Sequence, residues 1–199
     1  MRITAEEKEA TRERIEGAAL ELFRTRGFEA TTTRDIARQA DIAVGTLFNY
    51  FAAKEAIVAA LAEEGLTKAQ ATAEKQPAAE SLEEDLFALV AAELRQLKPL
   101  RKFIAPVLET ALCPLASATQ NGEASLRIRH LEGVARIARA HGVAEISAVA
   151  LQVYWSLYTG VLAYWAADKS PKQEDTLALL DNSLHMFSAW LQDAPAEPR

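Results

Sequence analysis

The sequence predicts an all-α protein, and three observations carry this prediction. Alanine, the best helix former, supplies 40 of the 199 residues, whereas the helix breakers glycine and proline number only 8 and 7. Apolar residues recur at spacings of three and four along most of the chain, as on the buried face of an amphipathic helix. Half of the residues are hydrophobic and a quarter are charged, so the chain can bury a core. We expect about nine helices.

The chain begins with two predicted helices. A first helix over residues 8–26 carries one apolar stripe, and Gly27 supplies the left-handed residue that ends it. A second helix over 33–40 begins after Thr32, which forms a capping box with Asp35 three residues later.

A tight turn and a third helix follow. Residues 41–43 are too few for anything but a corner. In the predicted helix over 44–51, Leu47 and Phe51 share one buried face, and Phe48 widens it. Three helices, the last two joined by a short turn, are typical of a helix-turn-helix unit.

The rest of the chain predicts a helical bundle. A long helix over 54–76 leads into it, and residues 77–80 break that helix. Further helices are expected over 82–97, 123–140, 145–167 and 173–192. Another helix is expected to begin at Pro99 and to kink at Pro106, and residues 113–122 are expected to form a loop. We therefore predict a helix-turn-helix domain over 1–54, a connecting helix over 54–76, and a second helical domain over 77–199.

The charge balance excludes a broadly basic nucleic-acid coat. The chain has 22 Lys and Arg against 28 Asp and Glu, a net charge of −6 and a pI near 5.2. Residues 1–51 hold 8 basic and 9 acidic side chains, a net charge of −1. Nucleic-acid binding would therefore rest on a few directed contacts rather than on a broad positive field.

Export and membrane insertion are not expected. The N-terminus has no apolar signal core, and the single cysteine, Cys113, cannot form an intrachain disulfide or a Cys-based zinc cage. Cys113 is interpreted as a small buried apolar residue, with a redox-sensitive thiol as the alternative. Residues 146–167 are uncharged and long enough to span a bilayer, but no Lys/Arg cluster flanks them, so we expect a buried helix. These observations predict a cytoplasmic protein.

Catalysis is not expected either. His130, His141 and His185 are scattered, and none has a Glu three residues before it, as a di-iron carboxylate site requires. The HExxH, Walker A, GxGxxG and nucleophile-elbow motifs are missing from the sequence. We therefore expect no metal and no cofactor.

The stretch from Thr31 to Glu55, TTTRDIARQADIAVGTLFNYFAAKE, resembles the DNA-binding segment of TetR-family transcriptional regulators. The shared pattern is a Thr-Thr pair, a basic residue, an Ile-Ala pair, a short turn, Gly-Thr-Leu-aromatic, an aromatic-Phe pair and Lys-Glu. The resemblance covers about the first quarter of the chain. It implies a homodimeric, ligand-responsive repressor that binds a palindromic DNA operator. The alternative is a helical sensor or adaptor that does not bind DNA.

The third predicted helix would read the major groove, because its leading residues Val44, Gly45 and Thr46 are small. Val44 and the Thr46 methyl are expected to contact thymine methyl groups. The Thr46 hydroxyl or Asn49 is expected to form a hydrogen bond with a base edge or a phosphate. With the positions that the resemblance implies, the expected DNA contacts are Thr33, Arg34, Val44, Gly45, Thr46, Asn49, Tyr50 and Lys54.

Three residues depart from the family pattern. Asp41 stands where the turn usually holds Gly, and Ala43 stands where Ser usually caps the helix. Val44 replaces a Lys or Gln, which removes a hydrogen bond to DNA. These departures concern the target sequence rather than the mode of binding.

The resemblance also implies a pocket for a small-molecule effector in the second domain. Five aromatic residues are the candidates for its lining: Phe87, Phe103, Tyr154, Trp155 and Tyr158. Their helical spacing makes core packing the alternative. No buried acidic cluster is evident, which favours a mostly apolar effector.

The last two predicted helices indicate a dimer interface. In the final helix five apolar residues are spaced three and four apart: Leu177, Leu180, Leu184, Phe187 and Leu191. In the preceding helix, Ser156 and Gly160 form a small-residue edge that permits close approach of another helix. Two helices from each subunit would form a four-helix bundle, as the resemblance also implies. The alternative is that both stripes close only the monomer's own core.

Overall fold

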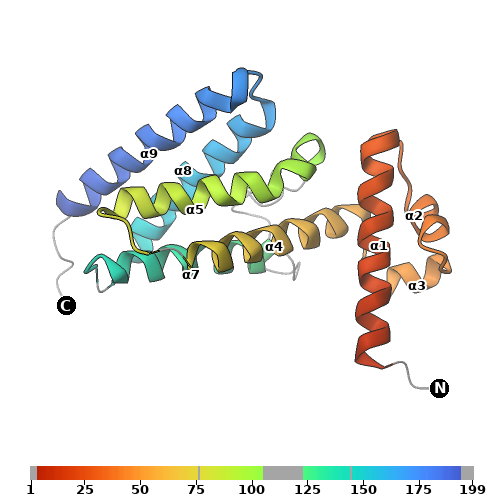
Figure 1. The fold of residues 1–199 in the computed structure, drawn as a ribbon. Coiled ribbons are helices and arrows are strands. Elements are labelled where there is room, and N and C mark those ends of the chain that lie inside the picture. The colour runs from red at the N-terminus through yellow and green to blue at the C-terminus, as the bar shows by residue number, and fades with distance from the viewer. Residues whose placement is uncertain (1–3, 76, 105–122, 144, 194–199) are drawn as a thin grey trace.

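The computed structural model describes residues 4–75, 77–104, 123–143 and 145–193, and these residues form helices and no strand (Figure 1). The helices are α1 (Ala5–Arg26), α2 (Thr33–Gln39), α3 (Val44–Phe48), α4 (Lys54–Ala73), α5 (Leu82–Leu97), η1 (Lys98–Phe103), α7 (Glu123–Ala140), α8 (Ala148–Ala167), η2 (Pro171–Gln173) and α9 (Glu174–Asp193). The all-α prediction is confirmed. The predicted kink at Pro106, the loop over 113–122 and Cys113 lie outside the described residues.

Two of the first three helices differ from the predicted ranges by three residues, whereas α2 ends one residue early, at Gln39. α1 begins three residues early, because Thr4 and Glu7 form a capping box at its start. α3 ends at Phe48, because the amide of Asn49 donates to the carbonyl of Thr46, three residues back, at 3.1 Å. Such bonds tighten the last turn and stop the helix.

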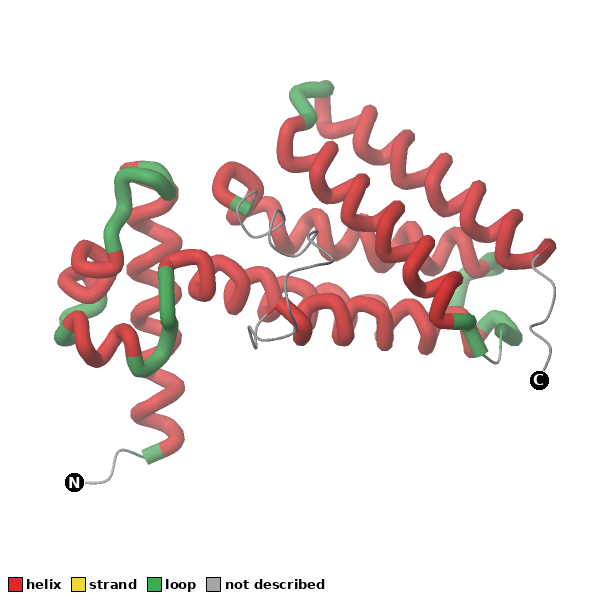
Figure 2. The backbone as a smooth tube through the Cα atoms, turned by 180° about the vertical axis from the view of Figure 1, so that it is seen from behind, coloured by secondary structure: helices red, strands yellow, loops and turns green. Residues whose placement is uncertain are grey.

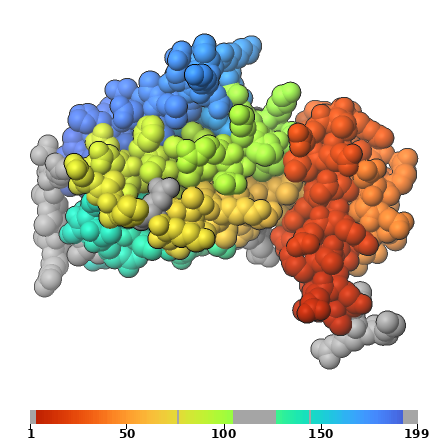
Figure 3. All heavy atoms as spheres, in the orientation of Figure 1, coloured from red at the N-terminus to blue at the C-terminus, as the bar shows by residue number. Residues whose placement is uncertain are grey.

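Helices α1 to α3 form a head at one end of the molecule. α1 lies across the end of α4, and α2 and α3 lie on the side of α1 away from the other helices, as the views from front and back agree (Figures 1 and 2). In the space-filling view the head is a lobe that projects from the elongated body (Figure 3). The helix-turn-helix is therefore at the end of the molecule and open to a partner.

The body consists of α4, α5, α7, α8 and α9 with the two short 3₁₀ helices. α4 packs against α5 and α7, and α9 packs against α5 and α8. One hydrophobic cluster runs from Ile15 in the head to Phe187 in α9. The rings of Phe23 in α1 and Phe103 in η1 lie 5.3 Å apart, so aromatic packing joins the head to the body.

The connection between α8 and α9 is built around Arg101 and Asp168. Arg101 Nε donates to the carbonyl of Trp165 at 2.7 Å, and the same guanidinium donates to the carbonyl of Asp168. These bonds satisfy carbonyls at the end of α8, which have no partners within the helix.

Candidate nucleic-acid interface

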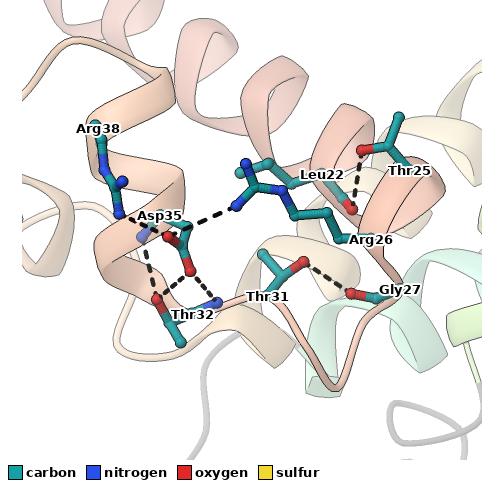
Figure 4. Close-up of polar contacts among 8 residues, drawn as sticks. All are labelled: Leu22, Thr25, Arg26, Gly27, Thr31, Thr32, Asp35 and Arg38. Atoms are coloured by element: carbon teal, nitrogen blue, oxygen red, sulfur yellow. Dashed lines mark hydrogen bonds and ion pairs between the residues drawn. The ribbon is translucent and has the colours of Figure 1, made fainter.

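The start of α2 is held by a capping box between Thr32 and Asp35 (Figure 4). The amide of Asp35 donates to the Thr32 hydroxyl oxygen at 3.1 Å, and the Thr32 hydroxyl and amide donate to Asp35 Oδ2 at 2.6 and 3.2 Å. The hydrogen bond from the Thr32 hydroxyl is the main reason why the pKa of the Asp35 carboxyl is below its usual value. Asp35 Oδ1 lies 2.7 Å from Arg38 Nη2 and 3.8 Å from Arg26 Nη1. The acidic side chain thus orients two guanidinium groups at this end of the head.

The turn between α2 and α3 contains one residue in the left-handed region. Asp41 has φ 53°, a left-handed conformation that Gly adopts most readily and Asp tolerates better than most residues. The amide of Asp41 donates to the carbonyl of Arg38 at 3.2 Å, and that of Ile42 donates to the carbonyl of Ala37 at 3.0 Å. These bonds turn the chain sharply, so α3 begins directly after α2 ends.

The outer face of α3 is open, as groove insertion requires. Leu47 is fully buried and anchors the helix to the head. Gly45 and Asn49 are exposed, and the space that a Cβ on Gly45 would occupy is empty. Thr46 and Val44 are half-buried, and Ala43 makes no side-chain cap, as predicted. Small or polar side chains therefore lead this helix.

Phe48 corrects the sequence interpretation. It was expected to widen the buried face of α3, but half of its surface is exposed. Leu47 already occupies the inward position, and the next residue is rotated by about 100° around the helix. Phe48 thus joins the outer face of α3 and becomes a candidate contact that the sequence interpretation missed.

A shallow hollow of about 630 Å³ lies where α2 meets α3. It is lined by Arg34, Arg38, Asp41, Ile42, Ala43 and Val44. Arg34 is exposed and forms no ion pair with any residue that the structure describes. Thr33 is half-buried at the start of α2. Basic side chains thus border the uncharged leading end of α3, although the head as a whole is not basic.

Two of the predicted DNA contacts also serve the head itself. Tyr50 is partly buried against the core. Lys54 Nζ donates to the carbonyls of Phe28 and Thr31 at 2.8 and 3.3 Å and lies 4.2 Å from the centre of the Phe28 ring. The ammonium group therefore ties the start of α4 to the loop between α1 and α2.

None of the five predicted pocket residues lines the hollow beside α3 or the cavity between α4, α5 and α7 in the described part of the chain. Tyr154, Trp155 and Tyr158 are buried together in α8, around the buried His130 of α7. Phe103 instead packs on the head, and Phe87 is partly buried against the core. Core packing, the alternative for these aromatics, therefore describes them better.

A cavity of about 250 Å³ lies in the body between α4, α5 and α7. Its lining includes Gln70, Glu74, Asp85, Leu89, Gly133, Arg136 and Ile137. α4 and α7 approach each other closely beside this cavity. A Cβ on Gly133 of α7 would lie only 3.0 Å from Gln70 Nε2 of α4. Gly133 and Gln70 gave no recognisable signal in the sequence, because each is an ordinary residue within a helix.

The predicted dimer seam is only partly at the surface. Leu180, Leu184 and Phe187 are buried in the protomer's own core, so the prediction that they face a partner is wrong. Leu177 is exposed and Leu191 is partly buried. Ser156 and Gly160 are exposed, as expected of an edge that meets another helix.

An uncharged face remains exposed across the last two helices. In α8 it consists of Val149, Val153, Ser156, Gly160, Ala163, Tyr164 and Ala167. In α9 it consists of Leu179, Asn182, Met186, Ala189 and Trp190. Most of these side chains are apolar, and exposed apolar residues gathered on one face mark interaction surfaces.

No group of three or more His, Cys, Asp or Glu among the described residues could hold a metal ion. In the same part of the chain, none of the helices is sufficiently long and apolar to span a membrane.

Comparison with known proteins points to one family. Residues 15–61 match the model for bacterial regulatory proteins of the tetR family. A probable HTH-type transcriptional regulator of Bacillus subtilis (strain 168), YttP, is 34% identical over 86 residues, which span 42% of this chain and 42% of that relative. The chain therefore matches less than half the length of this curated relative.

Two solved structures resemble almost the whole chain. Thermus thermophilus FadR, a TetR-family transcriptional repressor in complex with lauroyl-CoA, is 26% identical, with a TM-score of 0.66 and coverage of 94% of this chain and 100% of that one. A TetR transcriptional regulator from Rhodococcus sp. RHA1 has a TM-score of 0.71 at 16% identity, covering 90% of this chain and 97% of that one. The second likeness concerns the fold alone.

Proposed function

We propose that this chain, whose residues 15–61 match the model for bacterial regulatory proteins of the tetR family, belongs to that family and is a sequence-specific DNA-binding transcriptional regulator. It acts as a ligand-responsive repressor, as a homodimer on a palindromic operator in the cytoplasm. Residues 1–54 bind DNA, and residues 77–199 bind the second subunit and, together with the connecting helix α4, the effector.

The observation that carries this proposal is the geometry of α3. Its uncharged outer face leads with Val44, Gly45 and Thr46, and Arg34 and Arg38 border it. An α-helix enters the major groove when its leading side chains are small, and flanking basic groups meet the phosphates. Base contacts are assigned to Val44, Gly45, Thr46 and Asn49, and backbone contacts to Thr33, Arg34 and Tyr50. For Lys54 we favour a positioning role, since its ammonium group is already bonded to two carbonyls.

Dimerisation is supported by the uncharged face of α8 and α9. The side chains of this face are uncharged and mostly apolar, and α8 and α9 lie away from α2 and α3 in the fold (Figure 1). Pairing two such faces around a two-fold axis would form a four-helix bundle and place the two heads on one side. Dimeric helix-turn-helix proteins read half-sites about 34–36 Å apart, so the separation of the heads governs binding.

Ligand response is supported by the position of the cavity beside α4, the helix that connects head and body. Three contacts hold α4 to α7. Gln70 Nε2 donates to the carbonyl of Arg129 at 2.8 Å, Arg129 pairs with Glu63 at 3.3 Å, and Arg136 pairs with Glu74 at 2.7 Å. A small molecule in the cavity would separate these helices, move α4 and change the spacing of the heads.

Selection of bound sequences from a random pool of duplex DNA tests the function. We expect enrichment of one palindromic sequence with two half-sites. The purified protein with a scrambled duplex of equal length and composition serves as the control for non-specific binding. A pool without enrichment contradicts the proposal and favours the sensor or adaptor without DNA binding.

A further inference from the structure

The exposed large apolar side chains of the described residues are unevenly distributed. All but two lie on α8 or α9, namely Val149, Val153, Tyr164, Leu177, Leu179, Met186 and Trp190. The exceptions are Ile128 in α7 and Phe48 in α3. Phe48 is therefore the one large apolar side chain exposed in the described part of the head, residues 4–53. Single exposed apolar side chains are common on protein surfaces, so the significance of Phe48 lies in its position beside the surface assigned to DNA.

Phe48 shares its side of α3 with Val44. The two residues are four apart, so their side chains are neighbours on one face of the helix. Val44 is half-buried and lines the hollow between α2 and α3, which Arg34 and Arg38 border. Phe48 and Val44 thus form an apolar ridge beside the exposed Gly45 and Asn49. The ridge is continuous with the surface assigned to DNA.

The chemistry of the ridge limits what it can recognise. Neither Phe48 nor Val44 has a polar side-chain atom, so they cannot bond a phosphate or the donors and acceptors of a base edge. The one apolar group that a base pair presents in the major groove is the C5-methyl group of thymine. We propose that Phe48, together with Val44, reads thymine methyl groups and thereby sets the sequence preference of each half-site. This inference rests on the proposed function and assigns it a chemical target.

The direct test replaces each thymine of the selected operator, one at a time, by uracil, which differs only in lacking the methyl group. For the wild-type protein we expect the Kd to rise about fourfold at one or more positions per half-site, the factor for one buried methyl-sized group. For Phe48→Ala, the thymine and uracil duplexes should bind with the same Kd at a position that Phe48 reads. Phe48→Leu keeps an apolar side chain and should retain part of the discrimination.

Asn49→Ala is the matched control, because Asn49 is the exposed neighbour of Phe48 and is polar. It should weaken both duplexes alike and leave the ratio of their Kd values unchanged. Thermal unfolding of each variant checks that the head remains folded, as expected for exposed positions. The ridge is wrongly assigned if no uracil substitution changes the wild-type Kd, or if Phe48→Ala discriminates as the wild type does. A pool that yields no enriched sequence overturns the proposed function and this inference together.

Discussion

The Oε1 atom of Glu93 lies 2.8 Å from Nδ1 of His130, and both side chains are fully buried between α5 and α7. The imidazole also stacks on Tyr158, with 3.8 Å between ring centres, and its Nε2 lies 3.2 Å from the Tyr154 hydroxyl. Burial raises the pKa of both tyrosines well above the usual value, and the Glu93 carboxylate adds to this rise. The core of the body thus contains a polar cluster whose two phenols stay neutral.

Removing one member of the Glu93–His130 pair should destabilise the protein strongly. Glu93→Ala leaves His130 buried without its carboxylate, and such broken pairs cost about 3–5 kcal/mol of unfolding free energy. Replacing both residues by Leu should cost less, because neither member of the pair is then left without the other, although the Tyr154 hydroxyl loses its contact with His130 Nε2. Denaturant unfolding measures both effects. Arg95→Ala, at an exposed position of the same helix, is the control and should change stability by no more than about 0.5 kcal/mol. If Glu93→Ala and Arg95→Ala change the unfolding free energy equally, the buried Glu93–His130 pair does not stabilise the protein.

Asp168 predicts a loss of stability in acid. Its Oδ2 accepts from the hydroxyl of Thr176, and its Oδ1 accepts from the amide of Ser170 at 2.7 Å. The Thr176 bond is the main cause that lowers the pKa of Asp168 from 3.8 to about 2. Because the folded state has the lower pKa, this stabilisation is complete above about pH 4 and is lost as the pH falls towards 2.

Asp168→Asn isolates this effect, since it keeps the shape of the side chain and removes its charge. The wild type should exceed this variant in unfolding free energy above about pH 4, and the difference should shrink between roughly pH 4 and pH 2. Urea unfolding at a series of pH values measures it. A difference that stays constant over this range would show that Asp168 is not stabilised as a carboxylate.

The elements of the head were predictable because short-range patterns determine them. The capping box at Thr32, the left-handed residue at Asp41 and the buried Leu47 each follow from residues within four positions. Phe48 was misplaced because the bonds that stop α3 form only in the folded turn, and one rotation of 100° decides between core and solvent.

The body was less predictable because its contacts join distant segments. In α9, Leu184 and Met186 are both apolar, but one is buried and the other exposed, and only the position of α5 and α8 decides which. Glu93 did carry a signal, since it lies four residues after Leu89 and four before Leu97 on the apolar side of α5. A charge in such a stripe predicts a buried partner, but the identity of His130 required the fold.

Lys54→Ala should destabilise the head without changing the electrostatics of DNA binding. The ammonium group donates to the carbonyls of Phe28 and Thr31, and hydrogen bonds that involve a charged group contribute about 1.5–3 kcal/mol. Thermal unfolding should report this loss. Lys54→Met, which keeps the apolar stem beside the Phe28 ring, should be less affected.

The salt dependence of operator binding separates this role from a phosphate contact. If Lys54 acts within the head, the slope of log K against log salt concentration is the same for Lys54→Ala and the wild type. A slope reduced by about 0.9 for each subunit, with normal stability, would show instead that Lys54 neutralises a phosphate.

The dimer interface can be tested at one residue without disturbing the protomer. Gly160 is exposed in α8, and the space around a Cβ at this position is empty within the chain. Gly160→Leu should therefore leave the fold of the subunit intact, and any steric conflict must come from a second copy. Overpacking of a close helix contact costs about 1–3 kcal/mol, so the variant should shift towards monomer in sedimentation equilibrium at micromolar concentration.

Gly17→Leu is the matched control, because Gly17 is an exposed helical glycine in α1 with equally open surroundings. We expect this control to remain dimeric. If the wild type itself sediments as a 21.7 kDa monomer, the face on α8 and α9 is not a dimer interface, and two-headed reading of a palindrome has no structural basis.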